Sequence, residues 1–204
     1  MIPTVITNDG RGERAYDIYS RLLKDGVIFV RGVIDDDLAS TVTAQLLFLE
    51  NEAPENTINI YINSPGGSLT AALSIYDAMQ YVGPKVATLC TGLAASGASL
   101  LLAGGVKGMR MSLPHAQILI HQPFTQGIQG QASDIQIHAQ EVLNLRRRVD
   151  EIYAHHTGQD LERVHDDMER DRFFTAEQAV EYGLADRVIE THEIARTPTG
   201  FNGR

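Results

Sequence analysis

The sequence of 204 residues is poor in cysteine and in basic side chains. Its single cysteine, Cys90, cannot form an intramolecular disulfide, and its place in an apolar run predicts a buried, unreactive thiol. The 17 lysines and arginines are outnumbered by 26 aspartates and glutamates, which gives a formal net charge of −9. This deficit of positive charge argues against nucleic acid or an anionic membrane as the main partner.

Several signals of other protein classes are also missing. No apolar run reaches the length of a membrane span, and residues 1–14 lack the pattern of a secretory signal. No Gly-x-x-x-x-Gly-Lys-Ser/Thr loop occurs, and no group of cysteine, histidine or carboxylate residues has metal-ligand spacing. We therefore expect a cytoplasmic protein without a metal or cofactor, which receives any energy from ATP through a partner protein.

What the chain does have is an alternation of strand and helix patterns. Hydrophobic residues make up 43% of a length that suits one large domain or two small ones. Apolar periodicity predicts strands over residues 27–30, 57–63, 85–90, 116–120 and 186–189. It predicts helices over residues 15–23, 38–49, 69–81, 99–103, 161–169 and 175–183. The repeating strand–helix order predicts an α/β core with parallel strands.

A much longer helix is predicted over residues 131–157, which contain no proline or glycine. At about 1.5 Å per residue it is about 40 Å long, which is about the width of a globule of this chain length. We therefore expect it to project, either as an oligomerisation element or as an ordinary amphipathic surface helix. We expect residues 1–14 to form a flexible arm, residues 170–174 a loop, and residues 191–204 a disordered tail.

Three predicted strands are followed by candidate site residues, namely Gly66 with Gly67, Ser96 and His121. In open α/β folds, ligands collect where the carboxyl ends of the strands meet. Ser96 lies between a strand and a helix among small residues, which is typical of a nucleophile, although a simple N-cap is the alternative. Acyl transfer by a serine also needs a base, an acid that orients it, and oxyanion donors. The backbone N–H groups of Gly67 and Gly97 are candidate donors, with the glycine pair expected to open a helix.

The general base and the orienting acid each have rivals. His121 is the best candidate for the base because it follows a strand, and His115 is its main rival. Asp171 lies in a predicted loop between two arginines, whereas Asp166 and Asp167 resemble helix-surface charges. Composition alone does not choose between these acids.

Seven short motifs carry a resemblance to a known family. They are residues 11–14 (RGER), 16–23 (YDIYSRLL), 61–67 (YINSPGG), 94–96 (AAS), 120–123 (IHQP), 129–132 (QGQA) and 170–173 (RDRF). Together they resemble the proteolytic subunit of the Clp protease, the ClpP family of serine peptidases, over about residues 11–189. The resemblance implies a crotonase-like α/β spiral of strand–helix repeats with a projecting long handle helix.

By this resemblance, Ser96 is the nucleophile, His121 the general base and Asp171 the orienting acid. Gly67 and Gly97 take the oxyanion positions. Subunits of the family form seven-membered rings that stack face to face into a closed chamber, and a separate AAA+ unfoldase, a Clp ATPase, feeds in substrates. The resemblance therefore implies an ATP-dependent serine endopeptidase that hydrolyses unfolded polypeptides to short peptides.

The resemblance also divides the chain into an axial arm (1–14), a peptidase domain (15–190) with its handle over about residues 123–157, and a flexible tail (191–204). Arg172 is expected to contact a neighbouring subunit, so charge swaps there should disturb both activity and assembly. An apolar pocket for docking the unfoldase is matched by Tyr61, Tyr81, Leu89, Leu113 and Ile189.

The sequence departs from the family pattern at several positions. Gly97 replaces the usual methionine, which predicts a weaker or altered cleavage preference and a gain of activity on Gly97→Met. Asn59 and Thr91 replace larger side chains in the docking pocket, which predicts weaker binding of an unfoldase loop and of activator molecules. The alternative function is a weakly active or structural subunit of a mixed ring with a second ClpP paralogue. An acyl-CoA enzyme of the same fold is a third interpretation, against which the Ser-His-Asp set argues.

Overall fold

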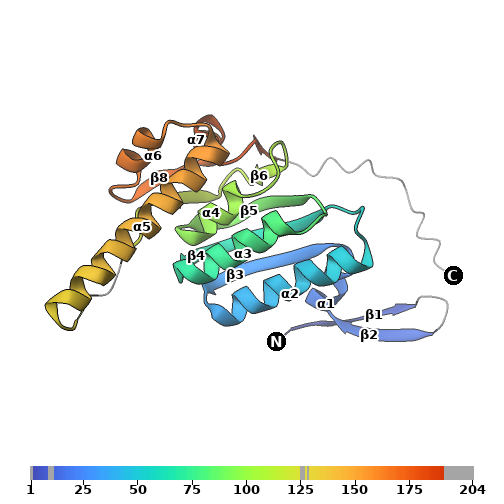
Figure 1. The fold of residues 1–204 in the computed structure, drawn as a ribbon. Helices are drawn as coiled ribbons and strands as arrows, with labels where there is room; N and C mark the ends of the chain where they lie inside the picture. The colour runs from blue at the N-terminus through green and yellow to red at the C-terminus, as the bar shows by residue number, and fades with distance from the viewer. Residues whose placement is uncertain (1, 9–11, 125–126, 128, 191–204) are drawn as a thin grey trace.

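The main sheet of the protein consists mostly of parallel strands (Figure 1). The computed structural model describes residues 2–8, 12–124, 127 and 129–190, so the expected tail lies outside the described residues. The central path of the sheet runs through β3 (Val27–Ile34), β4 (Ile58–Gly67), β5 (Val86–Ala95), β6 (Arg110–Ser112) and β9 (Arg187–Val188). The predicted α/β core with parallel strands is confirmed.

The sheet divides at β5, because two different strands pair with its two halves. Residues 88–90 pair with β6, whereas residues 93–95 pair with β7 (Gln117–Ile120). A further strand, β8 (Arg172–Phe174), pairs antiparallel with β7. The end of β5, which Ser96 follows, therefore lies beside the end of β7, which His121 follows.

Helices α2 (Asp36–Glu52), α3 (Leu69–Tyr81) and α4 (Gly97–Ala103) lie side by side over one face of the sheet (Figure 1). Three further short helices among the described residues are α1 (Ile18–Leu23), α6 (Leu161–Asp167) and α7 (Ala176–Tyr182). Capping side chains begin α2 and α3, since Asp35 accepts the N–H of Leu38 and Ser68 that of Ala71. Every residue of α4 is buried, so the turn that leads into α4 is anchored in the core.

The long helix predicted over residues 131–157 is present as α5 (Ala132–Thr157). Figure 1 shows its first half extending away from the sheet, while its second half packs against α4 and α6. Its buried residues are Val149, Asp150 and Tyr153. Ile137 and Leu143 are 66% and 58% exposed, so the single chain leaves apolar side chains of α5 in solvent.

The structure differs from the sequence-based expectations at its short strands. In place of a wholly flexible arm, β1 (Thr4–Asn8) and β2 (Glu13–Asp17) pair as an antiparallel hairpin. The segment expected as a loop contains β8, and the sequence pattern gives no sign of β6. Three residues are too few to show a period, so these strands are defined by their partners. No helix in the described part of the chain combines the length and apolar character needed to cross a membrane.

An ion pair between a buried arginine and a partly buried aspartate connects β6 to the segment before β9. Arg110, 3% exposed, donates to the carboxylate of Asp186 at 2.6 Å and to the carbonyl oxygens of His156 and Gly183 at 2.9 Å. Burial raises the pKa of Asp186, but hydrogen bonds from Arg110 outweigh burial and hold that pKa below its ordinary value. The carboxylate therefore stays charged and paired near neutral pH.

Arg110→Met is expected to lower the free energy of unfolding by about 2–4 kcal/mol, because the Asp186 carboxylate, only 16% exposed, then loses its guanidinium partner and keeps only backbone N–H donors. Urea unfolding followed by circular dichroism measures this change. The double variant Arg110→Met/Asp186→Asn is the matched control. It should regain part of the loss, because asparagine is uncharged and still accepts the N–H of Gly108, which Asp186 accepts at 2.7 Å. An Arg110→Met variant as stable as the wild type would contradict the assigned role of the pair.

Candidate active site

Ser96 occupies the turn between β5 and α4 in a strained backbone conformation. Its φ of 57° and ψ of −127° make it the one non-glycine residue with positive φ in the described ranges. Backbone strain of this kind costs on the order of 1–3 kcal/mol and is found most often at functional sites. A sharp turn from a strand to a helix is also the place where some hydrolases expose their nucleophilic serine. Ser96 does occupy the N-cap position of α4, as the alternative interpretation expects, but in the described structure its side chain makes no capping hydrogen bond.

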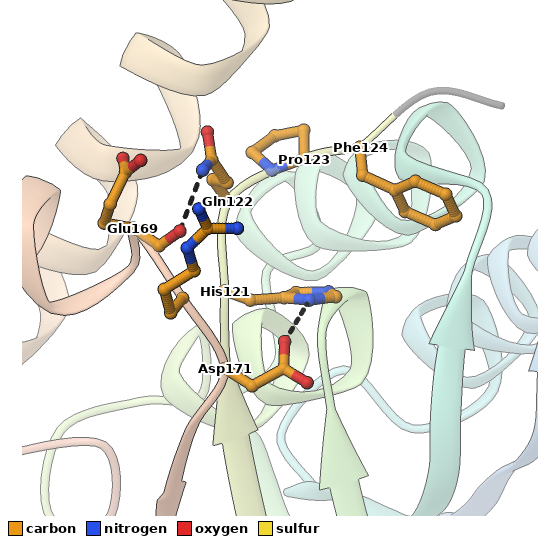
Figure 2. Close-up of a pocket in the computed structure, with 7 residues that line it drawn as sticks. His121, Gln122, Pro123, Phe124, Glu169 and Asp171 are labelled. Atoms are coloured by element: carbon orange, nitrogen blue, oxygen red, sulfur yellow. Dashed lines mark hydrogen bonds and ion pairs between the residues drawn. The ribbon is translucent and has the colours of Figure 1, made fainter. Parts of the chain in front are cut away.

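The pairing of β7 with β8 places His121 beside Asp171. Ile120 and Arg172 are partners in this antiparallel pair, so the residue after β7 lies next to the residue before β8. His121 Nδ1 lies 3.1 Å from Asp171 Oδ1 (Figure 2). The two side chains are 26% and 63% exposed. The contact orients the imidazole through Nδ1 and leaves Nε2 as the nitrogen for proton transfer.

The rival base and acids lie elsewhere. His115 is exposed and precedes β7, at the opposite end of that strand from the paired histidine. Asp166 is an exposed residue of α6, and Asp167 forms an ion pair with Arg172. The geometry therefore favours the histidine after β7 and the aspartate before β8.

Ser96 and His121 line one cavity of about 440 Å³. Its apolar walls come from β3, β4, α3, α4, α5 and the segment after β7, and include Val33, Pro65, Leu69, Leu100, Pro123, Phe124, Val149 and Tyr153. A second cleft of about 590 Å³ contains Asp171 and shares His121, Pro123 and Phe124 with the first (Figure 2). The histidine thus stands between the cavity that contains the serine and the cleft that contains the aspartate.

Sequence reasoning missed Tyr153 as a residue of this cavity. Tyr153 lies four residues after Val149, so the two share one face of α5. That spacing is the signal that would have found it.

Gly66 and Gly67 end β4 directly against the Ser96 turn. The helix predicted over residues 69–81 is present as α3, after the Ser68 cap, but the glycine pair belongs to the end of β4 and not to the start of that helix. A Cβ on Gly66 would lie 2.7 Å from the Cβ of Ser96, and one on Gly67 would overlap the carbonyl group of Ile34. Gly67 also has a φ of +155°, which side chains rarely allow. Glycine therefore lets this strand end approach the serine closely.

Gly97 opens α4 and lines the same cavity as Ser96 and Gly67. The first N–H groups of a helix have no partner within the helix, so the Gly97 N–H is not used by α4. A Cβ on Gly97 would lie 2.7 Å from the Cβ of Ala72 in α3. A methionine there would push against α3, which argues against the predicted gain of activity from Gly97→Met.

The residues expected to form a docking pocket come together in part. Tyr61 and Leu89 are partners in the pairing of β4 with β5. Leu113 and Ile189 directly follow the paired region of the parallel strands β6 and β9, at the same end of the sheet. Tyr81 instead comes from the end of α3 and is 78% exposed.

Arg172 is occupied by contacts within its own chain. It forms an ion pair with Asp167, and its guanidinium lies 5.2 Å from the ring centre of Phe174 and 5.3 Å from that of Tyr182. The side chain is nevertheless 38% exposed. The expected contact with a neighbouring subunit stays a prediction.

One comparison with known proteins bears on these residues. A family model described as Clp protease matches residues 10–192. The matched range contains the Ser96 turn, the His121–Asp171 pair and every strand of the main sheet.

Proposed function

Because the chain belongs to the Clp protease family, we propose that it is a serine endopeptidase, the proteolytic subunit of an ATP-dependent Clp protease. One observation carries the proposal: Ser96, in a strained turn, shares a cavity with His121, whose Nδ1 contacts Asp171. The proposed substrates are unfolded polypeptides, which are cut to short peptides.

In the proposed mechanism, His121 accepts the proton of Ser96 Oγ as that oxygen attacks the scissile carbonyl carbon. His121 Nδ1–H donates to Asp171, which fixes the tautomer and stabilises the imidazolium. The N–H groups of Gly67 and Gly97 hold the oxyanion. His121 then gives the proton to the leaving amine. Water, activated by the same histidine, hydrolyses the acyl group from Ser96.

The proposed assembly is a pair of stacked seven-membered rings that enclose a chamber, served by an AAA+ unfoldase. The exposed Ile137 and Leu143 of α5 support such an assembly, because a contact between subunits would cover them. Tyr61 and Leu89, side by side on the sheet, support an apolar docking site for the unfoldase. A cytoplasmic location belongs to the same proposal. We propose no metal or cofactor, since side chains, N–H groups and water carry every step of the mechanism.

The second candidate is a weakly active or structural subunit of a mixed ring with a second ClpP paralogue. The exposure of Asp171 favours this candidate, because 63% of its side chain is open to water. Water then competes with His121 for the carboxylate, and the base is held less firmly in the single chain.

Intact-mass analysis after incubation with a fluorophosphonate separates the two candidates. We expect one adduct per chain, because an activated serine attacks phosphorus with loss of fluoride. Ser96→Ala should carry no adduct. A wild-type chain that stays unmodified alone, and reacts only after a ClpP paralogue is added, would support the mixed ring.

Gly97→Met is expected to slow formation of that adduct about tenfold or more, because overpacking against Ala72 displaces the Ser96 turn. Ala72→Gly removes the obstructing Cβ, so the double variant Gly97→Met/Ala72→Gly should recover most of the rate. Ala72→Gly alone is the matched control. A single Gly97→Met variant that reacts faster than the wild type would restore the sequence-based expectation.

A further inference from the structure

The carbonyl oxygen of Leu119 in β7 connects the serine turn to the strand that ends before His121. Ser96 donates its backbone N–H to this oxygen at 2.9 Å, and Ser99 Oγ lies 2.7 Å from it. Because Leu119 lies two residues before His121, these bonds bear directly on how the serine lies relative to the histidine.

The hydroxyl of Tyr153 in α5 extends this network. It lies 2.7 Å from Ser99 Oγ and 3.3 Å from the carbonyl oxygen of Ser96. Both side chains are buried, with Ser99 at 0% and Tyr153 at 2% exposure. Burial raises the pKa of the Tyr153 hydroxyl, so this group keeps its proton and can donate it.

The protons of the network can be assigned by counting donors and acceptors. The Ser96 carbonyl already accepts the backbone N–H groups of Ser99 and Leu100, at 2.9 and 3.3 Å. Ser99 Oγ lies 2.7 Å from this oxygen and 2.7 Å from the Leu119 carbonyl oxygen, so its one proton has two acceptors within reach. The Ser96 carbonyl has two donors already, so the best-satisfied arrangement runs from Tyr153 O–H to Ser99 Oγ and from Ser99 O–H to the Leu119 carbonyl. A chain of buried hydroxyls of this kind holds its backbone partners in one geometry.

A second residue of α5 is bonded to the segments that carry His121 and Asp171. Arg146 lies seven residues, or about two helical turns, before Tyr153 in α5. It donates to Gln122 Oε1 and to Glu169 Oε2, both at 2.8 Å. Gln122 directly follows His121, and Glu169 lies two residues before Asp171. The helix is therefore bonded to the segments of all three candidate catalytic residues.

We propose that Tyr153 and Ser99 are positioning residues that align Ser96 with His121, so that the placement of α5 sets the reactivity of the serine. This inference rests on the proposed function. Because the first half of α5 extends away from the body, any contact that shifts this helix would act on the serine turn through the Tyr153 hydroxyl (Figure 1).

Kinetics of Tyr153→Phe test the inference in the full-length protein. We expect the rate of fluorophosphonate adduct formation and kcat for a peptide substrate to fall about tenfold, with KM unchanged, because the ring stays and only the hydroxyl leaves. Tyr182→Phe is the matched control. The Tyr182 hydroxyl is buried and has no hydrogen-bond partner among the described residues, so its removal should leave both rates unchanged.

Ser99→Ala and the double variant separate positioning from packing. Once Ser99→Ala has broken the chain, adding Tyr153→Phe should slow the reaction no further. Additive losses would mean that the two side chains act independently and would overturn the inference.

Hydrogen exchange provides a readout that does not need an active serine. Tyr153→Phe should speed amide exchange in peptides that span residues 94–103 and 117–122, whereas Tyr182→Phe should not. Exchange equal to the wild type in these peptides overturns the inference whether or not the chain is active. A wild-type chain that forms no adduct, while Tyr153→Phe does speed exchange, contradicts the proposed function alone.

Discussion

Ser96→Ala is expected to lower kcat for peptide hydrolysis by at least about 10⁴-fold, because the acyl-enzyme cannot form without the serine oxygen. The residual rate would come from binding and from the N–H groups of Gly67 and Gly97. Alanine keeps the Cβ that faces Gly66, so the loss should reflect chemistry and not a collapsed turn. Alanine at this position also has positive φ, as the serine does, which leaves the backbone strain unchanged.

Hydrolysis of a fluorogenic peptide, with thermal unfolding and gel filtration on the same samples, measures this effect. Ser20→Ala is the matched control, since Ser20 lies in α1, away from the candidate site, and its hydroxyl donates to Asp17 at 2.6 Å. A Ser96→Ala variant with unchanged stability and more than about a hundredth of the wild-type rate would show that another group is the nucleophile.

Asp171→Asn is expected to lower kcat by about 10²- to 10⁴-fold with little change in KM. The asparagine amide can donate to His121 Nδ1, which stabilises the tautomer whose proton sits on Nε2. That nitrogen can then no longer accept the proton of Ser96. The lower limit applies if water, which reaches the 63% exposed carboxylate, already weakens the pair in the wild type.

Peptidase assays of Asp171→Asn beside Asp166→Asn test the choice of acid. Asp166 is the natural control because it is exposed, lies in the neighbouring helix α6, and was an open candidate on sequence grounds. We expect Asp166→Asn to retain the wild-type rate. Loss of activity in Asp166→Asn, with Asp171→Asn active, would reverse the assignment of the orienting acid.

Local sequence was sufficient for the elements on which the candidate site is built. The apolar run before Ser96 predicts a strand and the run after it a helix, and the structure places β5 and α4 there. His121 likewise follows a predicted strand, which is β7. The long helix α5 is also predicted correctly, because its 26 residues are enough for the apolar pattern to repeat many times.

The same reasoning failed where an element is too short for its period to repeat. β8 has three residues, so its pattern does not reveal a strand, and the choice among three aspartates stayed open. The sequence pattern predicts that the strand before the glycine pair ends at residue 63, whereas β4 continues through Gly67, because glycines do not show the apolar alternation of a strand. The steric overlap between a side chain at position 97 and the Cβ of Ala72 could not be predicted from the sequence either, because it arises from the packing of α4 against α3.

The sequence by itself therefore determined the order of strands and helices and the placing of Ser96 and His121 at strand ends, because periodicity is a property of neighbouring residues. Only the tertiary structure decided which aspartate meets the histidine and which tyrosine reaches the serine turn. His121 and Asp171 are 50 residues apart in the chain, and Ser99 and Tyr153 are 54 apart. Contacts over such separations depend on strand register and helix packing, which no local pattern encodes.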